Sequence, residues 1–172
     1  MKHRAGRPSA AMLVGLAGLV AALGFSPAQA DEDADRAAAV AAATEQAAHW
    51  LDALDGGDYG ETWNDVAAVM KQGRSLDDWI ADVGMPRSAL GKPVARELQR
   101  ADFATTVRGA PRGQYVTATY LTQFAAAPPI LESILLTFAD GRWRVAGYNA
   151  LAAPSPPAPA APADKAGANP ED

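Results

Sequence analysis

The spacing of apolar residues changes at Gly91, and this change constrains the fold more than any other feature of the chain. Before Gly91 the apolar residues recur every three or four positions, which is the period of a helix with one buried face. After Gly91 they alternate, as in a strand. Helical segments followed by strands predict an α+β domain, with N-terminal helices packed on one face of a curved antiparallel sheet of about four strands.

Three amphipathic helices are expected before the change. An alanine-rich helix spans residues 33–54 and is stopped by two glycines, a second spans 59–70, and a third begins at 76 and ends near Gly84 and Pro86. The second and third begin with residue pairs that have the spacing of a capping box, Asp58 with Glu61 and Ser75 with Asp78.

Four strands are expected after the change, over residues 94–107, 114–124, 130–139 and 142–148. The last two are joined by Asp140-Gly141, a strong signal for a two-residue hairpin turn. Both faces of the 130–139 strand are largely apolar, whereas a sheet with one solvated face should alternate. We therefore expect a homodimer that covers the second face of the sheet.

The first thirty residues have the order of a secretory signal peptide. Lys2, Arg4 and Arg7 precede an apolar run, and small residues end with Ala30. We predict a Sec-type signal cleaved after Ala30 and a periplasmic or secreted protein. The alternative is an uncleaved membrane anchor, but the apolar run is shorter than the roughly 20 residues that a spanning helix needs. No stable membrane insertion is expected after cleavage.

The remaining chain is expected to comprise one α+β domain, residues 31–151, and a disordered tail rich in proline and alanine, residues 152–172. The formal net charge is −5, and loss of the three basic signal residues brings it to −8. Nucleic acid is therefore not an expected partner. The chain has no cysteine and keeps one histidine, His49, after cleavage, so neither a metal site nor a cofactor is expected.

Several segments resemble the bacterial family of domain of unknown function 4019. They are WLDALDGGDYGETW from Trp50, LGKPVARELQRADFATTVRGAPRGQYV from Leu90, LES from Leu131 and DGRWRVAGY from Asp140. The resemblance covers roughly residues 43–148. It implies a small exported bacterial domain with a fold similar to the nuclear-transport-factor-2-like or cystatin-like α+β folds, and it implies no established activity.

Glu132 is the strongest chemical candidate, because it shares a strand phase with the bulkier apolar residues and should face the helices. A carboxylate there is desolvated, and its pKa rises unless a cation pairs with it; Arg96 is the candidate partner. Three hypotheses stay open. Glu132 forms a structural ion pair with Arg96, or it is an exposed acid at the end of the strand. In the third, it accepts a proton in a pocket where Tyr120 or Tyr115 polarises a substrate oxygen.

Export, small size and the missing catalytic motifs favour a noncatalytic binding or interaction domain of the bacterial cell envelope. Its partner is expected to be an envelope protein or a small ligand. The alternative is a small pocket enzyme that uses Glu132 with Tyr120 or Tyr115 for acid/base chemistry. The candidate ligand-binding residues are Arg96, Tyr115, Tyr120, Glu132 and Trp63.

Overall fold

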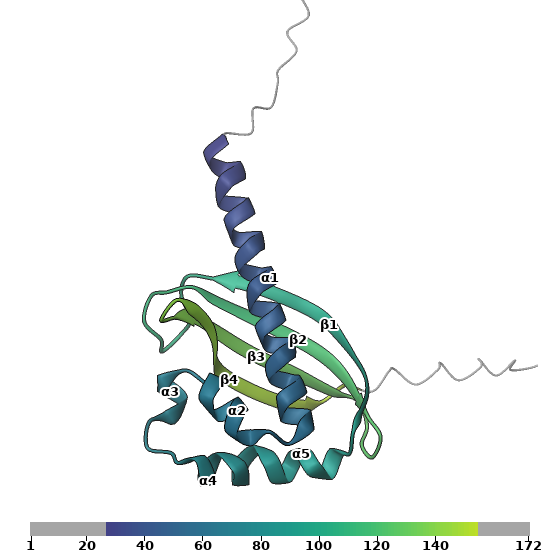
Figure 1. Cartoon of the computed structure of the whole chain (residues 1–172). Helices are drawn as coiled ribbons and strands as arrows, with labels where there is room; N and C mark the ends of the chain where they lie inside the picture. The colour runs from purple at the N-terminus through teal and green to yellow at the C-terminus, as the bar shows by residue number, and fades with distance from the viewer. Residues whose placement is uncertain (1–26, 155–172) are drawn as a thin grey trace, which may run out of the picture.

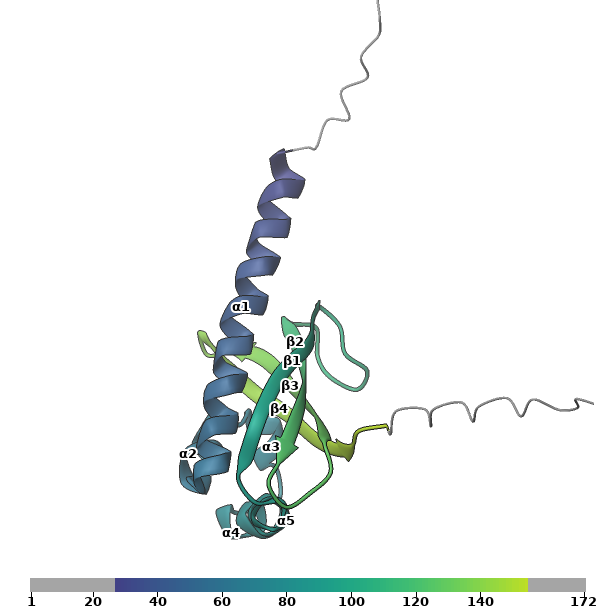
Figure 2. The ribbon, with the colours of Figure 1, turned by 90° about the vertical axis from the view of Figure 1, so that its right-hand side faces the viewer.

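The computed structural model describes residues 27–154, so most of the predicted signal peptide and of the predicted tail lies outside the described residues. The strands form one antiparallel sheet in the order β1-β2-β3-β4. The first helix, α1, crosses one face of this sheet, and the shorter helices gather at one end of the molecule (Figures 1 and 2). The predicted α+β class with N-terminal helices is confirmed.

The long helix α1 (Pro27–Gly56) begins before the predicted start and ends close to the predicted end. Its C-terminal half has the expected spacing of fully buried apolar residues, which are Ala43, Ala47, Trp50, Leu51 and Leu54. Residues 28–38 are all exposed, and this part of α1 extends beyond the sheet (Figure 1). The C-terminal half of α1 is therefore the part that anchors the helix to the core.

The predicted second helix is two helices, α2 (Tyr59–Asp65) and α3 (Ala68–Lys71). The residues between them, Val66 and Ala67, have extended backbone angles. Val66 forms a parallel bridge with Val145, and the N–H of Ala67 donates to the carbonyl of Val145 at 2.7 Å. Backbone pairing with the sheet therefore overrides the helical periodicity at this point.

The predicted third helix starts as expected, with a complete capping box, but it ends later than predicted. α4 (Leu76–Trp79) continues through a π-helical turn, η1 (Ile80–Gly84), into α5 (Met85–Leu90). The expected end near Pro86 is wrong, because Pro86 stands at the start of α5. Pro86 has no N–H to donate, and the π-helical turn directly before α5 interrupts the regular α-helical hydrogen bonding at this point.

The four strands are β1 (Pro93–Ala104), β2 (Tyr115–Phe124), β3 (Ile130–Ala139) and β4 (Arg142–Ala152). β1 ends earlier than predicted and β4 continues past its predicted end at Tyr148. Asp140 and Gly141 make the predicted turn, with φ values of 53° and 77°. Positive φ at both positions is the type I′ geometry that matches the twist of a hairpin.

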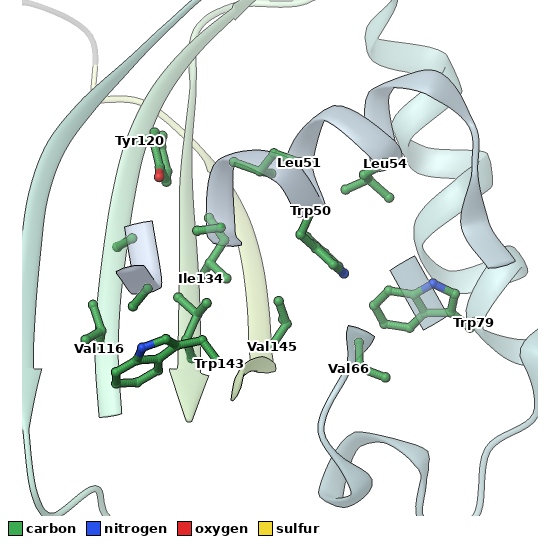
Figure 3. Packing of buried hydrophobic residues seen from close by; sticks show 14 residues of the cluster. Trp50, Leu51, Leu54, Val66, Trp79, Val116, Tyr120, Ile134, Trp143 and Val145 are labelled. Atoms are coloured by element: carbon green, nitrogen blue, oxygen red, sulfur yellow. The ribbon is translucent and has the colours of Figure 1, made fainter. Parts of the chain in front are cut away.

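The core lies between α1 and the face of the sheet that points toward it, here called the inner face. Trp50 from α1 and Trp79 from α4 are both buried, with ring centroids 6.1 Å apart (Figure 3). Their indole N–H groups donate to the carbonyl and the hydroxyl of Thr62, so neither is left without a partner. The sheet contributes fully buried residues to this core, including Val116, Ala118, Ile134, Leu136 and Val145.

The opposite face of the sheet, here called the outer face, is covered less completely. Tyr115 at one end is buried and donates to the carbonyl of Pro111 in the β1–β2 loop. Leu131 and Leu135 are only partly buried, and Leu151 is 60% exposed. The homodimer expected from the two apolar faces of β3 stays a prediction.

The close packing of η1 against α2 can be tested at Gly84. A Cβ atom at this position would stand 2.9 Å from the Tyr59 ring, and the Tyr59 hydroxyl donates to the Gly84 carbonyl. We expect Gly84→Ala to lower the free energy of unfolding by about 1–3 kcal/mol through overpacking, measured by urea denaturation.

Gly60→Ala is the matched control, because Gly60 is also helical. An added Cβ there would stand 3.8 Å from the nearest atom, Asp58 Oδ1, which is an ordinary van der Waals contact. This variant should be neutral or slightly stabilising, because alanine restricts the unfolded chain. Equal effects of the two substitutions would contradict the packing described for η1.

Candidate functional site

Glu132 on β3 lies at the centre of the most polar region of the interior. Its side chain is fully buried, and it stands between Tyr120 on β2 and Ala150 on β4 in the strand register. The next inner-face residue along β3, Ile134, is also fully buried. The prediction that Glu132 faces the helices is confirmed.

Both carboxylate oxygens of Glu132 are occupied. Oε1 accepts from Arg87 Nη1 at 2.5 Å and from the Tyr148 hydroxyl at 2.8 Å. Oε2 accepts from the Thr122 hydroxyl and from Arg96 Nη2, the latter at 3.3 Å. A buried carboxylate is stable only when its charge is paired and its lone pairs are satisfied, and here both conditions hold.

A second carboxylate, Asp55 at the end of α1, binds the same two arginines. It accepts from Arg87 Nε at 2.9 Å and Nη2, and from Arg96 Nη2 at 2.7 Å. The Arg87 guanidinium also stacks on the Phe124 ring, with 4.7 Å between its carbon and the ring centroid. Two carboxylates and two guanidiniums thus neutralise each other.

This arrangement, called the Glu132 cluster below, joins six elements of the fold. Its members are Asp55 (α1), Arg87 (α5), Arg96 (β1), Thr122 (β2), Glu132 (β3) and Tyr148 (β4). All four strands and two helices therefore meet at one set of charge-assisted hydrogen bonds.

The cluster keeps Glu132 ionised. Burial alone raises the pKa of this carboxyl, but the hydrogen bonds and charge of Arg87, together with Thr122 and Tyr148, lower it below its ordinary value. Burial would lower the pKa of Arg87, whereas its anionic surroundings raise it. Burial and the neighbouring Glu132 raise the pKa of Tyr148. At neutral pH the pair is charged and the phenol keeps its proton.

Of the five site residues predicted from the sequence, Arg96 and Glu132 form the expected ion pair. Tyr120 lies beside Glu132 on the inner face, but its hydroxyl donates to the Thr44 carbonyl at 3.2 Å. Tyr115 lies on the outer face. It therefore cannot act with Glu132 on one substrate.

The fifth predicted residue, Trp63 on α2, packs against Trp79 with 6.1 Å between ring centroids. Lys71 Nζ lies 5.3 Å from the centroid of the Trp63 ring. Trp63 is therefore part of the packing between the short helices and makes none of the hydrogen bonds of the Glu132 cluster.

Sequence reasoning missed Arg87, the arginine closest to Glu132. The predicted helix end near Pro86 placed Arg87 in a loop, where its direction could not be assigned. Thr122 and Tyr148 were accessible from the sequence, because Thr122 shares its strand phase with Tyr120 and Tyr148 ends a predicted strand.

A pocket of about 430 Å³ borders the cluster and is called the β4 pocket below. Arg87 and Tyr148 belong to both the cluster and the pocket wall. The other lining residues are Met70, Arg74, Trp79, Asp82, Val83, Pro86, Leu90, Ile130, Asn149 and Ala150. Its only further charges, Arg74 and Asp82, form an ion pair with each other. The pocket thus has mainly apolar walls and no uncompensated charge.

Within residues 27–154 no group of three or more candidate side chains is arranged to hold a metal ion. Over the same residues, no helix combines the length and the hydrophobicity that crossing a membrane requires.

A family model described as protein of unknown function (DUF4019) matches residues 46–148. The chain belongs to this family. The DUF4019 match begins inside α1 and ends in β4, so it contains all six members of the Glu132 cluster. No curated protein and no solved structure matches the chain.

The energetic role of the Glu132 cluster can be measured with Glu132→Gln. This change keeps the shape of the side chain but leaves the buried Arg87 and the partly buried Arg96 with only Asp55 as a cluster carboxylate, because Asp52, the other partner of Arg96 at 3.7 Å, is exposed. We expect the free energy of unfolding at pH 7 to fall by about 3–5 kcal/mol, as for other broken buried ion pairs. Glu97→Gln on β1 is the control, because Glu97 is exposed and the change should stay within about 0.5 kcal/mol.

Comparison of the wild type with Glu132→Gln over a range of pH tests the ionisation of Glu132. Because its pKa is lowered by folding from about 4.5, the charge stabilises the fold above this pH, and the stabilisation is lost as the pH falls through the folded pKa. The stability difference between wild type and Glu132→Gln should therefore narrow below about pH 4.5. A difference that is constant with pH would contradict a charged Glu132.

Proposed function

We propose that this protein is an exported, noncatalytic binding domain of the cell envelope and that its ligand site is the β4 pocket. The observation that carries this proposal is the contrast between two neighbouring features. The carboxylate of Glu132 is buried with both oxygens occupied, whereas the pocket beside it is open and mainly apolar.

The geometry speaks against the alternative of a pocket enzyme. A general base needs a free lone pair within reach of substrate and a pKa near the working pH. Glu132 has neither, because its oxygens are fully engaged and its pKa is lowered. The Tyr120 hydroxyl donates a hydrogen bond to the Thr44 carbonyl in α1, and Tyr115 lies on the outer face.

The lining of the β4 pocket selects the class of ligand. Its volume is within the range of small-molecule sites, about 300–1,000 Å³. Met70, Val83, Leu90 and Ile130 supply apolar contact, while the charge of Arg87 is cancelled by the cluster. An uncharged and largely apolar group suits this lining, because a net charge would lose its hydration without gaining a counter-ion.

Binding can be tested with the uncharged fluorophore N-phenylnaphthylamine. Trp79 lines the β4 pocket, so occupation should quench tryptophan emission and raise the emission of the probe. We expect Ala150→Phe to weaken binding by at least about tenfold, a change of about 1.4 kcal/mol. Its stability should stay close to that of wild type, because Ala150 is exposed and the added ring only fills the pocket.

Ala95→Phe is the matched control, since Ala95 is an exposed strand alanine on β1, and it should bind the probe as wild type does. No saturable binding by wild type, or equal binding by the Ala150 and Ala95 variants, would refute the β4 pocket as the ligand site.

Export can be tested by identifying the first residue of the mature protein. Cleavage after Ala30 would place Asp31, Glu32 and Asp33 in the first turn of α1, where acidic side chains interact favourably with the helix dipole. We expect the intact mass of the protein from the periplasm or medium to correspond to a chain that starts at Asp31. A chain that still contains residues 1–30 would contradict the proposed signal.

A further inference from the structure

The edge of β4 is open over its second half. β4 is the last strand of the sheet, and only β3 pairs with it along its length. On its other side the bridge from Val66 and Ala67 reaches Val145. Among the described residues no further backbone hydrogen bond is made to that side of residues 147–152. This part of β4 therefore has unpaired backbone groups.

The direction of those groups follows from the bonds at the two ends of the segment. The carbonyl of Val145 points away from β3, because it accepts from Ala67, and the N–H of Ala153 points toward β3, because it donates to Pro129. Backbone groups alternate in direction along an antiparallel strand. The β-bulge at Ala146, between the pairs Leu136–Val145 and Leu135–Gly147, reverses this alternation once, so the direction from Gly147 onward is set by Ala153. Tyr148, Ala150 and Ala152 consequently point their N–H and C=O groups away from the sheet.

The β4 pocket runs along this open edge. Three consecutive residues, Tyr148, Asn149 and Ala150, line it. Successive side chains of a strand point to opposite faces, so a pocket that touches three in a row must pass the edge of the strand. Its opposite wall comes from α3, η1 and α5, including Met70, Val83 and Leu90. The result is a groove with backbone groups on one side and apolar side chains on the other.

The two edges of the sheet differ in their protection. β1 carries two register shifts and begins with Pro93, and it has several charged side chains, Arg96, Glu97, Arg100 and Asp102. Prolines, bulges and charges are the usual means of preventing an edge strand from pairing with another chain. Residues 147–152 of β4 have no charge and no proline.

We propose that an extended peptide segment of a partner protein pairs with β4 at residues 147–152 and places an apolar side chain in the β4 pocket. This inference rests on the proposed function and specifies its ligand. Main-chain pairing with Tyr148, Ala150 and Ala152 provides affinity, and the pocket selects the side chain. The Val66–Ala67 segment already pairs with the same edge at Val145 within the molecule.

A peptide suits this groove better than the chain's own tail or a second copy. Five of the nine residues from Pro154 to Pro162 are prolines, which lack the N–H that a ladder requires. A second copy would approach with its own α3, η1 and α5 beside its β4, in the space that the first copy's helices occupy. A free strand from a partner brings no such obstruction.

Amide hydrogen exchange tests the proposal. A displayed library of short linear peptides is selected on the wild-type domain, and a selected peptide is added to isotopically labelled domain at about 100 times its Kd. We expect exchange at the outward amides of Tyr148, Ala150 and Ala152 to slow by up to about 100-fold. Asn149 and Leu151, which already face β3, should change less.

The possible outcomes distinguish failure of the peptide proposal from failure of the proposed pocket function. Bound peptide that leaves the outward amides unprotected, or binding of N-phenylnaphthylamine without any selected peptide, overturns the peptide proposal and leaves the pocket function standing. Failure of both probes overturns both proposals. Protection of the same amides without peptide, together with a doubled mass in light scattering, identifies a second copy instead and overturns the peptide proposal.

A substitution at Ala152 checks the backbone contact directly. Ala152→Pro removes one outward N–H at an exposed position that does not line the pocket. Ala152→Val keeps the N–H and is the reference, with circular dichroism confirming that both variants fold. The proline variant should bind the selected peptide about twofold to tenfold more weakly than the valine variant, the loss of one hydrogen bond. Equal binding would contradict pairing at this residue.

Discussion

The buried carboxylate of Glu132 sets the condition that the rest of this fold must satisfy. An unpaired charge in the interior costs several kcal/mol, so β3 is stable in its place only when Arg87 and Arg96 are in theirs. Arg87 reaches the carboxylate only if α5 docks, and Asp55 at the end of α1 is needed to balance the second positive charge. Helices and strands are therefore interdependent through a single neutral group of charges.

The sequence was sufficient where structure is determined locally. The change of period at Gly91, the hairpin at Asp140-Gly141 and the inward direction of Glu132 all follow from residue spacing, and all three are confirmed. The sequence was insufficient where contacts with distant parts of the backbone determine the ends of the helices. Val66 leaves the helical pattern to pair with Val145, and the π-helical turn carries the helix past Pro86, which turns Arg87 into an interior residue.

The cluster also links the polar interior to the β4 pocket. Arg87 and Tyr148 are held in fixed positions by Glu132, and the same two residues form part of the wall of the β4 pocket. A wall whose side chains are already ordered loses little conformational entropy when a ligand binds. The charges that occupy both oxygens of Glu132 thus also order part of the wall of the β4 pocket, which supports the binding function proposed for it.

The family match and the open edge of β4 divide this site into two parts. The match ends at Tyr148, so the cluster and the helical wall of the pocket lie within it, whereas residues 149–152 of β4 lie beyond it. The rigid part of the site is therefore made by the DUF4019 segment, and most of the edge is made by the residues that follow. A partner that pairs with the edge would use both parts, because its backbone would meet residues 149–152 and its side chain would meet the helical wall of the β4 pocket, which lies within the match.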